Sequence, residues 1–224
     1  MNYCRIVEKI EAFVSENFNI LELLYLREGD CKYSALINSI TNGKTLKQLK
    51  KEIGKFYRFQ GMDDNQRINL LKLFDDENEI IKNIDSNKID DVFDLYCKFL
   101  KRTEKITEKC QYVNTAKLMN LYNQSLPLFD NNVLNFLNYL NNDEEIEKRS
   151  TKNYLHILNI YKIINEQNCV PNIVKLKNSI YSKMEIKHIN LNKFVDTLMY
   201  FINDGKKLSE YKILCINKKG QTST

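Results

Sequence analysis

A single carboxylate, Asp130, stands between an apolar segment and an amphipathic helix, where it is well placed for acid–base chemistry. The four residues before it, 126–129, are apolar and include one of only two prolines in the chain. Apolar neighbours exclude bulk water from a carboxylate and strengthen its electric field. Such a group can stabilise a developing positive charge or accept a proton from water. Asp130 is therefore a carboxylate whose surroundings are compatible with such chemistry.

Asp130 also has a structural interpretation as the N-cap of a helix. Apolar residues recur at helical spacing after it, from Val133 to Leu140, and predict a helix that begins at the carboxylate. An aspartate at this position accepts hydrogen bonds from the first backbone amides and stabilises the helix by about 1 kcal/mol. The sequence leaves both interpretations open.

The segment around Asp130 resembles the small helical base-excision DNA glycosylases of the helix-hairpin-helix superfamily. In that family, a helix opening with a Thr-Ala pair leads through a short apolar loop to a catalytic aspartate, which begins the next helix. Here Thr115 and Ala116 form the pair, residues 126–129 form the loop, and Asp130 is the aspartate. The resemblance therefore implies that Asp130 is the catalytic residue. Val133 occupies a position where the family has an aliphatic residue.

Departures from the family pattern narrow the activity that the resemblance implies. The lysine of the bifunctional members directly precedes Thr-Ala, where this chain has Asn114, and Lys117 follows the pair instead. Residues 110–114 lack the glycines with which the family hairpin holds a phosphate, and Asn132 replaces a histidine often found after the aspartate. The resemblance therefore implies monofunctional hydrolysis, without Schiff-base chemistry or strand cleavage.

Hydrolysis of the N-glycosidic bond of a damaged or modified base is the reaction that the resemblance implies, in base-excision DNA repair. The base must leave the duplex stack to be reached, so the enzyme needs a pocket with an aromatic wall. The expected pocket residues beside Asp130 are Asn114, Lys117, Tyr112 and Tyr122.

A basic segment at 44–59 is the candidate surface for binding DNA. It contains six lysine and arginine residues against a single acid, Glu52, and Thr45 is expected to cap a helix over 46–59. Basic and aromatic side chains can hold phosphates and stack on bases. Alternatively, the aromatic residues of this segment belong to the core and its rim. The expected DNA-binding residues are Lys51, Lys55, Tyr57, Arg58 and Lys109.

Composition indicates an all-α protein of about ten helices. The 224 residues are 43% apolar and 28% charged, with only six glycines and two prolines, which favours helices joined by short polar connections. We expect one unit over 1–205, or two closely packed lobes (30–140, and 1–29 with 141–205) with a cleft between them. A basic, partly disordered tail is expected over 206–224.

Several classes of site and location are not indicated by the sequence. The six cysteines form no C-x-x-C pair and only two histidines accompany them, so no metal site or cofactor is expected. No apolar run approaches the roughly 18 residues of a membrane span, and the first residues do not resemble a signal peptide. We expect a cytoplasmic monomer with reduced thiols, no membrane association, and DNA as its partner.

A non-enzymatic function is the main alternative. The net charge of +5 is compatible with nucleic-acid binding but does not require it. The chain would then be an all-α module that binds nucleic acid or protein, as a defence or regulatory component. A third hypothesis is a glycosylase fold that binds DNA without catalysis.

Overall fold

A computed structural model describes residues 2–28, 31–57, 59, 61–140, 150–184 and 190–203. These residues form twelve α-helices and one 3-10 turn and contain no strand, which confirms the all-α prediction. The helices are α1 (Tyr3–Glu16), α2 (Phe18–Glu28), α3 (Cys31–Thr41), α4 (Lys50–Phe56), α5 (Asp64–Asp76), α6 (Asn78–Asn83), α7 (Ile89–Thr107), α8 (Tyr112–Tyr122), α9 (Asn131–Leu140), α10 (Thr151–Asn165), α11 (Pro171–Met184) and α12 (Leu191–Asn203). The predicted tail at 206–224 and Arg58 lie outside the described residues.

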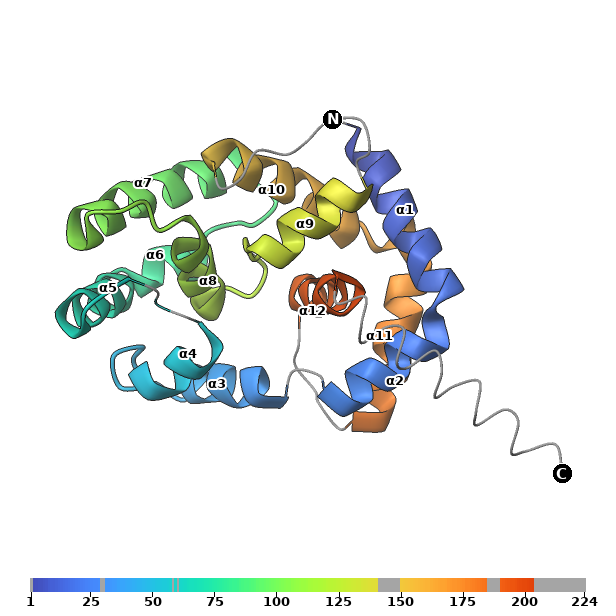
Figure 1. Cartoon of the computed structure of the whole chain (residues 1–224), viewed down its shortest axis with the longest axis horizontal. Coiled ribbons are helices and arrows are strands. Elements are labelled where there is room, and N and C mark those ends of the chain that lie inside the picture. Colours follow the sequence, from blue (N-terminus) through green and yellow to red (C-terminus); the bar gives the residue numbers. More distant parts are fainter. Residues whose placement is uncertain are drawn as a thin grey trace, which may run out of the picture.

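The helices form two groups, each built around a central helix (Figure 1). In the first group, α3 to α8, the central helix is α8, which contacts α3, α5, α6 and α7. In the second group, α1, α2 and α9 to α12, the central helix is α12, which contacts α2, α9, α10 and α11. Helix α9 belongs to this group through its contacts with α12 and α1.

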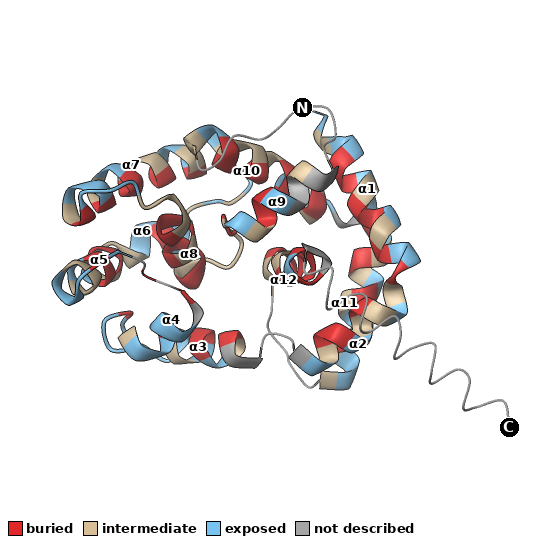
Figure 2. Cartoon of the chain, viewed as in Figure 1, coloured by how far each residue is buried: buried red, intermediate tan, exposed pale blue. Residues whose placement is uncertain are grey.

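Both central helices are largely buried (Figure 2). Residues 114–116 and 118–121 of α8 are all buried, and α12 buries apolar side chains such as Phe194, Val195 and Leu198. Tyr96 of α7 stacks on Tyr154 of α10 with ring centroids 3.9 Å apart, which joins the two groups through their cores. A polar side chain on either central helix therefore has protein, rather than bulk water, around most of its surface.

Capping residues explain several helix starts. Asp63 and Gln66 form a capping box at α5, and Ser150 caps α10. Pro171 occupies the first position of α11, where a missing amide hydrogen has no cost. The amides of Asn172 and Ile173 at the same end donate to the carboxylate of Glu11, a buried residue of α1. The N-terminal helix thus caps a helix near the end of the described chain.

The helix predicted over 46–59 is shorter than the sequence suggested, because α4 covers only Lys50–Phe56. Thr45 does begin a turn, since its hydroxyl accepts from the amide of Gln48 at 3.2 Å. The amides of Leu46 and Lys47, however, donate to the carboxylate of Asp75, at 2.6 and 3.0 Å. A residue of α5 therefore holds the start of this segment as a turn, which a local propensity argument cannot foresee.

Candidate functional site

The apolar segment 126–129 is completely buried and fixes Asp130 at the start of α9. The Oδ1 atom of Asp130 accepts hydrogen bonds from the amides of Asn132, at 2.9 Å, and Val133, at 3.1 Å. These contacts confirm the capping interpretation. The two hydrogen bonds also fix the orientation of the carboxylate, and therefore the direction in which its second oxygen, Oδ2, points.

The second oxygen of Asp130 faces Lys117 of α8. Lys117 Nζ lies 3.2 Å from Oδ2, and the two side chains retain 16% and 19% of their exposure. The same ammonium lies 5.1 Å from the centroid of the Tyr57 ring, a cation–π distance. The structure therefore brings together Asp130 and Lys117, two of the predicted site residues, as a partly accessible ion pair.

A second pair of the same kind comes from α12. Lys193 Nζ lies 2.8 Å from Asp196 Oδ2, with both side chains 12% exposed, and 4.9 Å from the centroid of the Tyr33 ring. Tyr33 belongs to α3 and Lys193 to α12, so this contact also crosses between the two helix groups. We refer to Lys117, Asp130, Lys193 and Asp196 as the charged cluster.

A chain of hydrogen bonds runs from the Lys193 side of the cluster back toward Asp130. The Tyr33 hydroxyl donates to Asn120 Oδ1 at 2.5 Å, and Asn120 Nδ2 donates to the carbonyl of Leu126 at 2.6 Å. Asn120 is a completely buried residue of α8, one turn beyond Lys117. Asn120 therefore connects, through its two hydrogen bonds, Tyr33 beside Lys193 and the apolar segment that positions Asp130.

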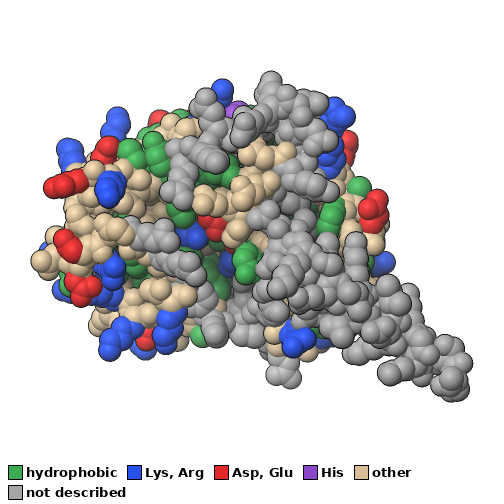
Figure 3. All heavy atoms as spheres, viewed as in Figure 1, with side chains coloured by type: hydrophobic (Ala, Val, Ile, Leu, Met, Phe, Trp, Pro, Cys, Tyr) green, Lys and Arg blue, Asp and Glu red, His purple; other side chains and the backbone are tan. Residues whose placement is uncertain are grey.

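The charges of the cluster act on the pKa values of Asp196 and Tyr161. Burial raises the pKa of the Asp196 carboxyl, the Asp130 charge raises it further, and Lys193 and Lys117 oppose both effects. Burial also raises the pKa of Tyr161 in α10, and the Asp196 and Asp130 charges add to that shift. Basic and acidic atoms lie next to each other near the middle of the face seen in Figure 3.

The other predicted pocket residues have contacts away from Asp130. Asn114 Nδ2 donates to Gln111 Oε1 at 3.0 Å, and the carbonyl of Tyr112 accepts from Tyr96 at 3.1 Å. The Tyr122 hydroxyl donates to Asp75, at the end of α8 that faces α5. These hydrogen bonds connect Asn114, Tyr112 and Tyr122 to partners outside the charged cluster, whereas Lys117 of the same helix pairs with Asp130.

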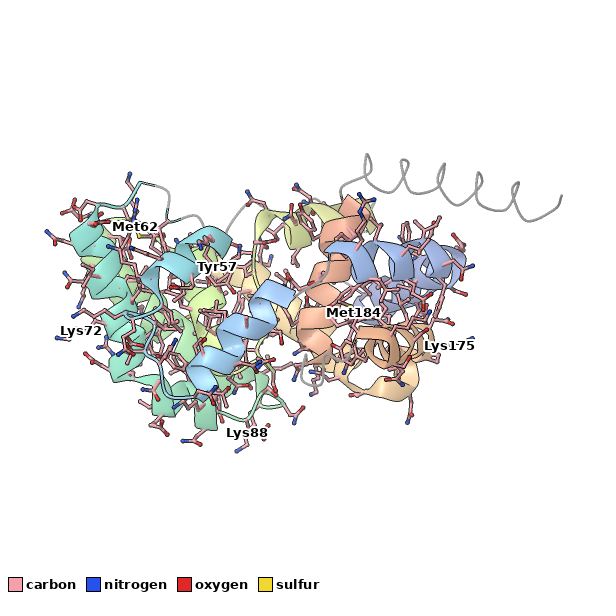
Figure 4. All side chains as sticks on the ribbon, turned by 90° about the horizontal axis from the view of Figure 1, so that it is seen from below. Tyr57, Met62, Lys72, Lys88, Lys175 and Met184 are labelled. Carbon is pink, nitrogen blue, oxygen red and sulfur yellow. The ribbon has the colours of Figure 1, made fainter. Side chains whose placement is uncertain are left out.

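The predicted DNA-binding residues divide into exposed lysines and one buried aromatic residue. Lys51 and Lys55 are exposed on α4, and Lys109 is exposed between α7 and α8, close to Gly61. Tyr57, which Figure 4 labels in the first helix group, is buried. Its ring contributes to the surroundings of Lys117. Arg58 lies outside the described residues.

Sequence reasoning missed Lys193 and Asp196. Their spacing of three residues is typical of an exposed ion pair on a helix, and nothing in it signals burial. The neighbouring residues give no signal either, because Phe194, Val195 and Leu198 lie on one face of α12, as in an ordinary amphipathic surface helix.

Other kinds of site are not found in the part of the chain that the structure describes. It contains no group of three or more His, Cys, Asp or Glu side chains that could hold a metal ion. None of its helices combines the length and the apolar character that crossing a membrane requires. Its cysteines Cys4, Cys97, Cys110 and Cys169 are free thiols.

No protein-family model matches the sequence, and no curated protein or solved structure matches the chain either. The charged cluster joins the two helix groups, since it contains the fixed carboxylate of Asp130, at the start of α9, and its lysine partner from α8.

Proposed function

We propose that this protein is a monofunctional, glycosylase-like hydrolase that cleaves the N-glycosidic bond of a damaged or modified base in DNA. One observation carries the proposal. Asp130 is held by the first amides of α9 through one oxygen, while its other oxygen faces Lys117 in a partly accessible position between the two helix groups. A rigid carboxylate beside the sugar is what this reaction requires.

The elements around Asp130 support the proposal. Helices α7 and α8 contact each other and form a helical hairpin, joined by residues 108–111, directly before the Asp130 segment. Glu108 ends α7 in the left-handed conformation, with φ of 57°, and so turns the chain tightly toward α8. The family resemblance rests on a helix with a Thr-Ala pair, an apolar loop and an aspartate that begins the next helix, and α8, residues 126–129 and Asp130 follow in that order.

The chemistry assigns separate roles to Asp130 and Lys117. As the base leaves, positive charge builds on the sugar, and the Asp130 carboxylate stabilises that charge and accepts a proton from the attacking water. Lys117 orients the carboxylate through its contact at 3.2 Å, and Tyr57 holds the lysine in place. Water is the nucleophile in this mechanism, so the products are the free base and an abasic site.

The experiment is release of free base from a panel of duplexes that carry different modified bases. Asp130→Asn is a sharp variant because asparagine caps a helix about as well as aspartate but carries no charge. We expect it to lower the single-turnover rate by at least about 100-fold, as loss of a catalytic carboxylate does. Asp63→Asn, at the capping box of α5, is the matched control and should leave the rate unchanged.

Two outcomes would contradict the proposal. Equal base release by the wild type and by Asp130→Asn would remove Asp130 from the mechanism. No release from any duplex, together with salt-sensitive DNA binding, would favour the alternative of a non-enzymatic binding module or a glycosylase fold without catalysis. That alternative is supported by the engagement of both Asp130 oxygens, one in the helix cap and one in the ion pair.

A further inference from the structure

The charged cluster contains a second carboxylate, Asp196, and the proposed reaction needs a group that protonates the departing base. We propose that Asp196 is the second acid–base residue of the site: it donates a proton to the departing base, while Asp130 accepts one from the attacking water. This inference rests on the proposed function. It adds a residue of α12 to a site that the sequence placed entirely around α8 and α9.

The first argument is the matching construction of the two ion pairs. Each consists of a lysine within about one hydrogen-bond length of a carboxylate, at 3.2 Å for Lys117 and Asp130 and 2.8 Å for Lys193 and Asp196. Each lysine also lies over a tyrosine ring from the first helix group. Both pairs keep some exposure, which a group that exchanges protons with a substrate needs.

The second argument is that the two pairs are physically connected. Tyr33, which lies under Lys193, donates to Asn120, and Asn120 holds the carbonyl of Leu126 in the segment that positions Asp130. The side-chain Nδ2 of Asn192, the residue before Lys193, also donates to the carbonyl of Ser125 at 2.5 Å. The start of α12 is thus bound to the loop that carries Asp130.

The third argument is electrostatic and agrees with the geometry. Burial and the Asp130 charge raise the pKa of Asp196, against the opposing effects of Lys193 and Lys117. Burial raises the pKa of Tyr161 in α10, and the charge of Asp196 raises it further, while the Tyr161 hydroxyl donates to Met199 Sδ at 4.0 Å. The aromatic residues of α2 and α11 that reach α12 contact Phe194 instead. An aspartate that retains its proton to higher pH beside an anchored second carboxylate suits an acid–base pair.

The proposed step balances as follows. The bond between the sugar carbon and the base nitrogen breaks, and its electron pair stays on the base, which takes the proton of Asp196. A water oxygen bonds to the sugar carbon and gives a proton to Asp130. The products are the neutral base and an abasic sugar, with Asp196 ionised and Asp130 protonated, and proton exchange with solvent restores the starting state.

The coupling can be tested without any substrate, on the full chain labelled with ¹³C at aspartate carboxyl groups. We expect the Asp196 resonance to titrate above the usual range of aspartates. Its midpoint should fall in Asp130→Asn, where a neighbouring negative charge is lost, and rise in Lys117→Met, where a positive charge is lost. A midpoint that stays unchanged in both variants would overturn the inference, whether or not the protein is an enzyme.

The catalytic role is tested by the pH dependence of single-turnover base release. If Asp196 is the general acid, the wild-type rate falls as the pH rises through the midpoint measured by NMR. Asp196→Asn should then lose this alkaline limb and be slower by about 100-fold or more. Asp64→Asn, which removes an exposed ion pair of the same spacing with Arg67, is the control and should keep the wild-type profile.

The outcomes separate this inference from the proposed function. Base release with an unchanged pH profile in Asp196→Asn would refute the role of Asp196 while the role of Asp130 stands. No base release by the wild type would refute the proposed function and the proton donation with it. The NMR titration would still report whether Asp130 and Asp196 are coupled.

Discussion

The ion pair between Lys117 and Asp130 is expected to contribute about 1–2 kcal/mol to the free energy of unfolding, between the values for exposed and buried pairs. Coulomb's law gives about 5 kcal/mol for unit charges at the observed 3.2 Å and an effective dielectric constant of about 20. Desolvation offsets much of this attraction. Exposed pairs retain about 0.2–1 kcal/mol, whereas removing one partner of a buried pair costs about 3–5 kcal/mol.

A double-mutant cycle isolates this contribution from the other contacts of the two residues. Asp130→Asn removes the charge but keeps the cap, and Lys117→Met removes the ammonium and its contact with Tyr57. The loss of the Tyr57 contact occurs in both the single and the double variant, so it cancels in the coupling energy. A third variant, Asp130→Ala, should cost about 1 kcal/mol more than Asp130→Asn because it also removes the cap.

The assay is urea unfolding at neutral pH, with the free energy extrapolated to water and the denaturant slope compared among variants. A coupling energy below about 0.3 kcal/mol, the usual limit of additivity, would show that the pair does not form in solution. Equal stability of Asp130→Asn and Asp130→Ala would show that Asp130 does not cap α9. Either result would refute the geometry on which the proposed site depends.

Two further predictions concern stability at low pH and DNA binding. Burial works to raise the pKa of Glu22, but hydrogen bonds and the charge of Lys183 outweigh it and the pKa is lowered. The ionised Glu22 therefore stabilises the folded protein at a pH above its pKa in the unfolded chain, and this contribution is lost as the pH falls through its pKa in the folded protein. Urea unfolding should therefore show Glu22→Gln less stable than the wild type at pH 7, with the difference vanishing in acid; a constant difference would refute the assignment. Reversing the charge of exposed Lys51 or Lys55 should weaken duplex binding and lower its salt dependence by about one phosphate contact, whereas Lys175→Glu, at the opposite end of the molecule (Figure 4), should not. Equal effects at all three positions would indicate binding through net charge alone.

The sequence by itself determined the helical class and offered the cap at Asp130 as one of two interpretations, which the structure confirms. Apolar residues at helical spacing, the scarcity of glycine and proline, and polar residues before each apolar run act locally, so they can be read along the chain. The cap at Asp130 is local in the same sense, because its carboxylate binds amides two and three residues later. The same local signals predicted too long a helix at 46–59, because the carboxylate of Asp75, from a different helix, accepts hydrogen bonds from the amides of Leu46 and Lys47 and holds them in a turn.

Only the tertiary structure decided which of the predicted residues lie beside Asp130 and which unpredicted residues join them. Lys117, thirteen positions away in the chain, lies beside it because α8 ends and α9 begins around a buried apolar loop. Lys193 and Asp196 join it because α12 is the central helix of the second group, a fact that depends on the packing of five other helices. Spacing within one helix cannot show whether its charged face meets water or another helix. The packing of the two groups decides this, and it places the ion pair of Lys193 and Asp196 in the charged cluster.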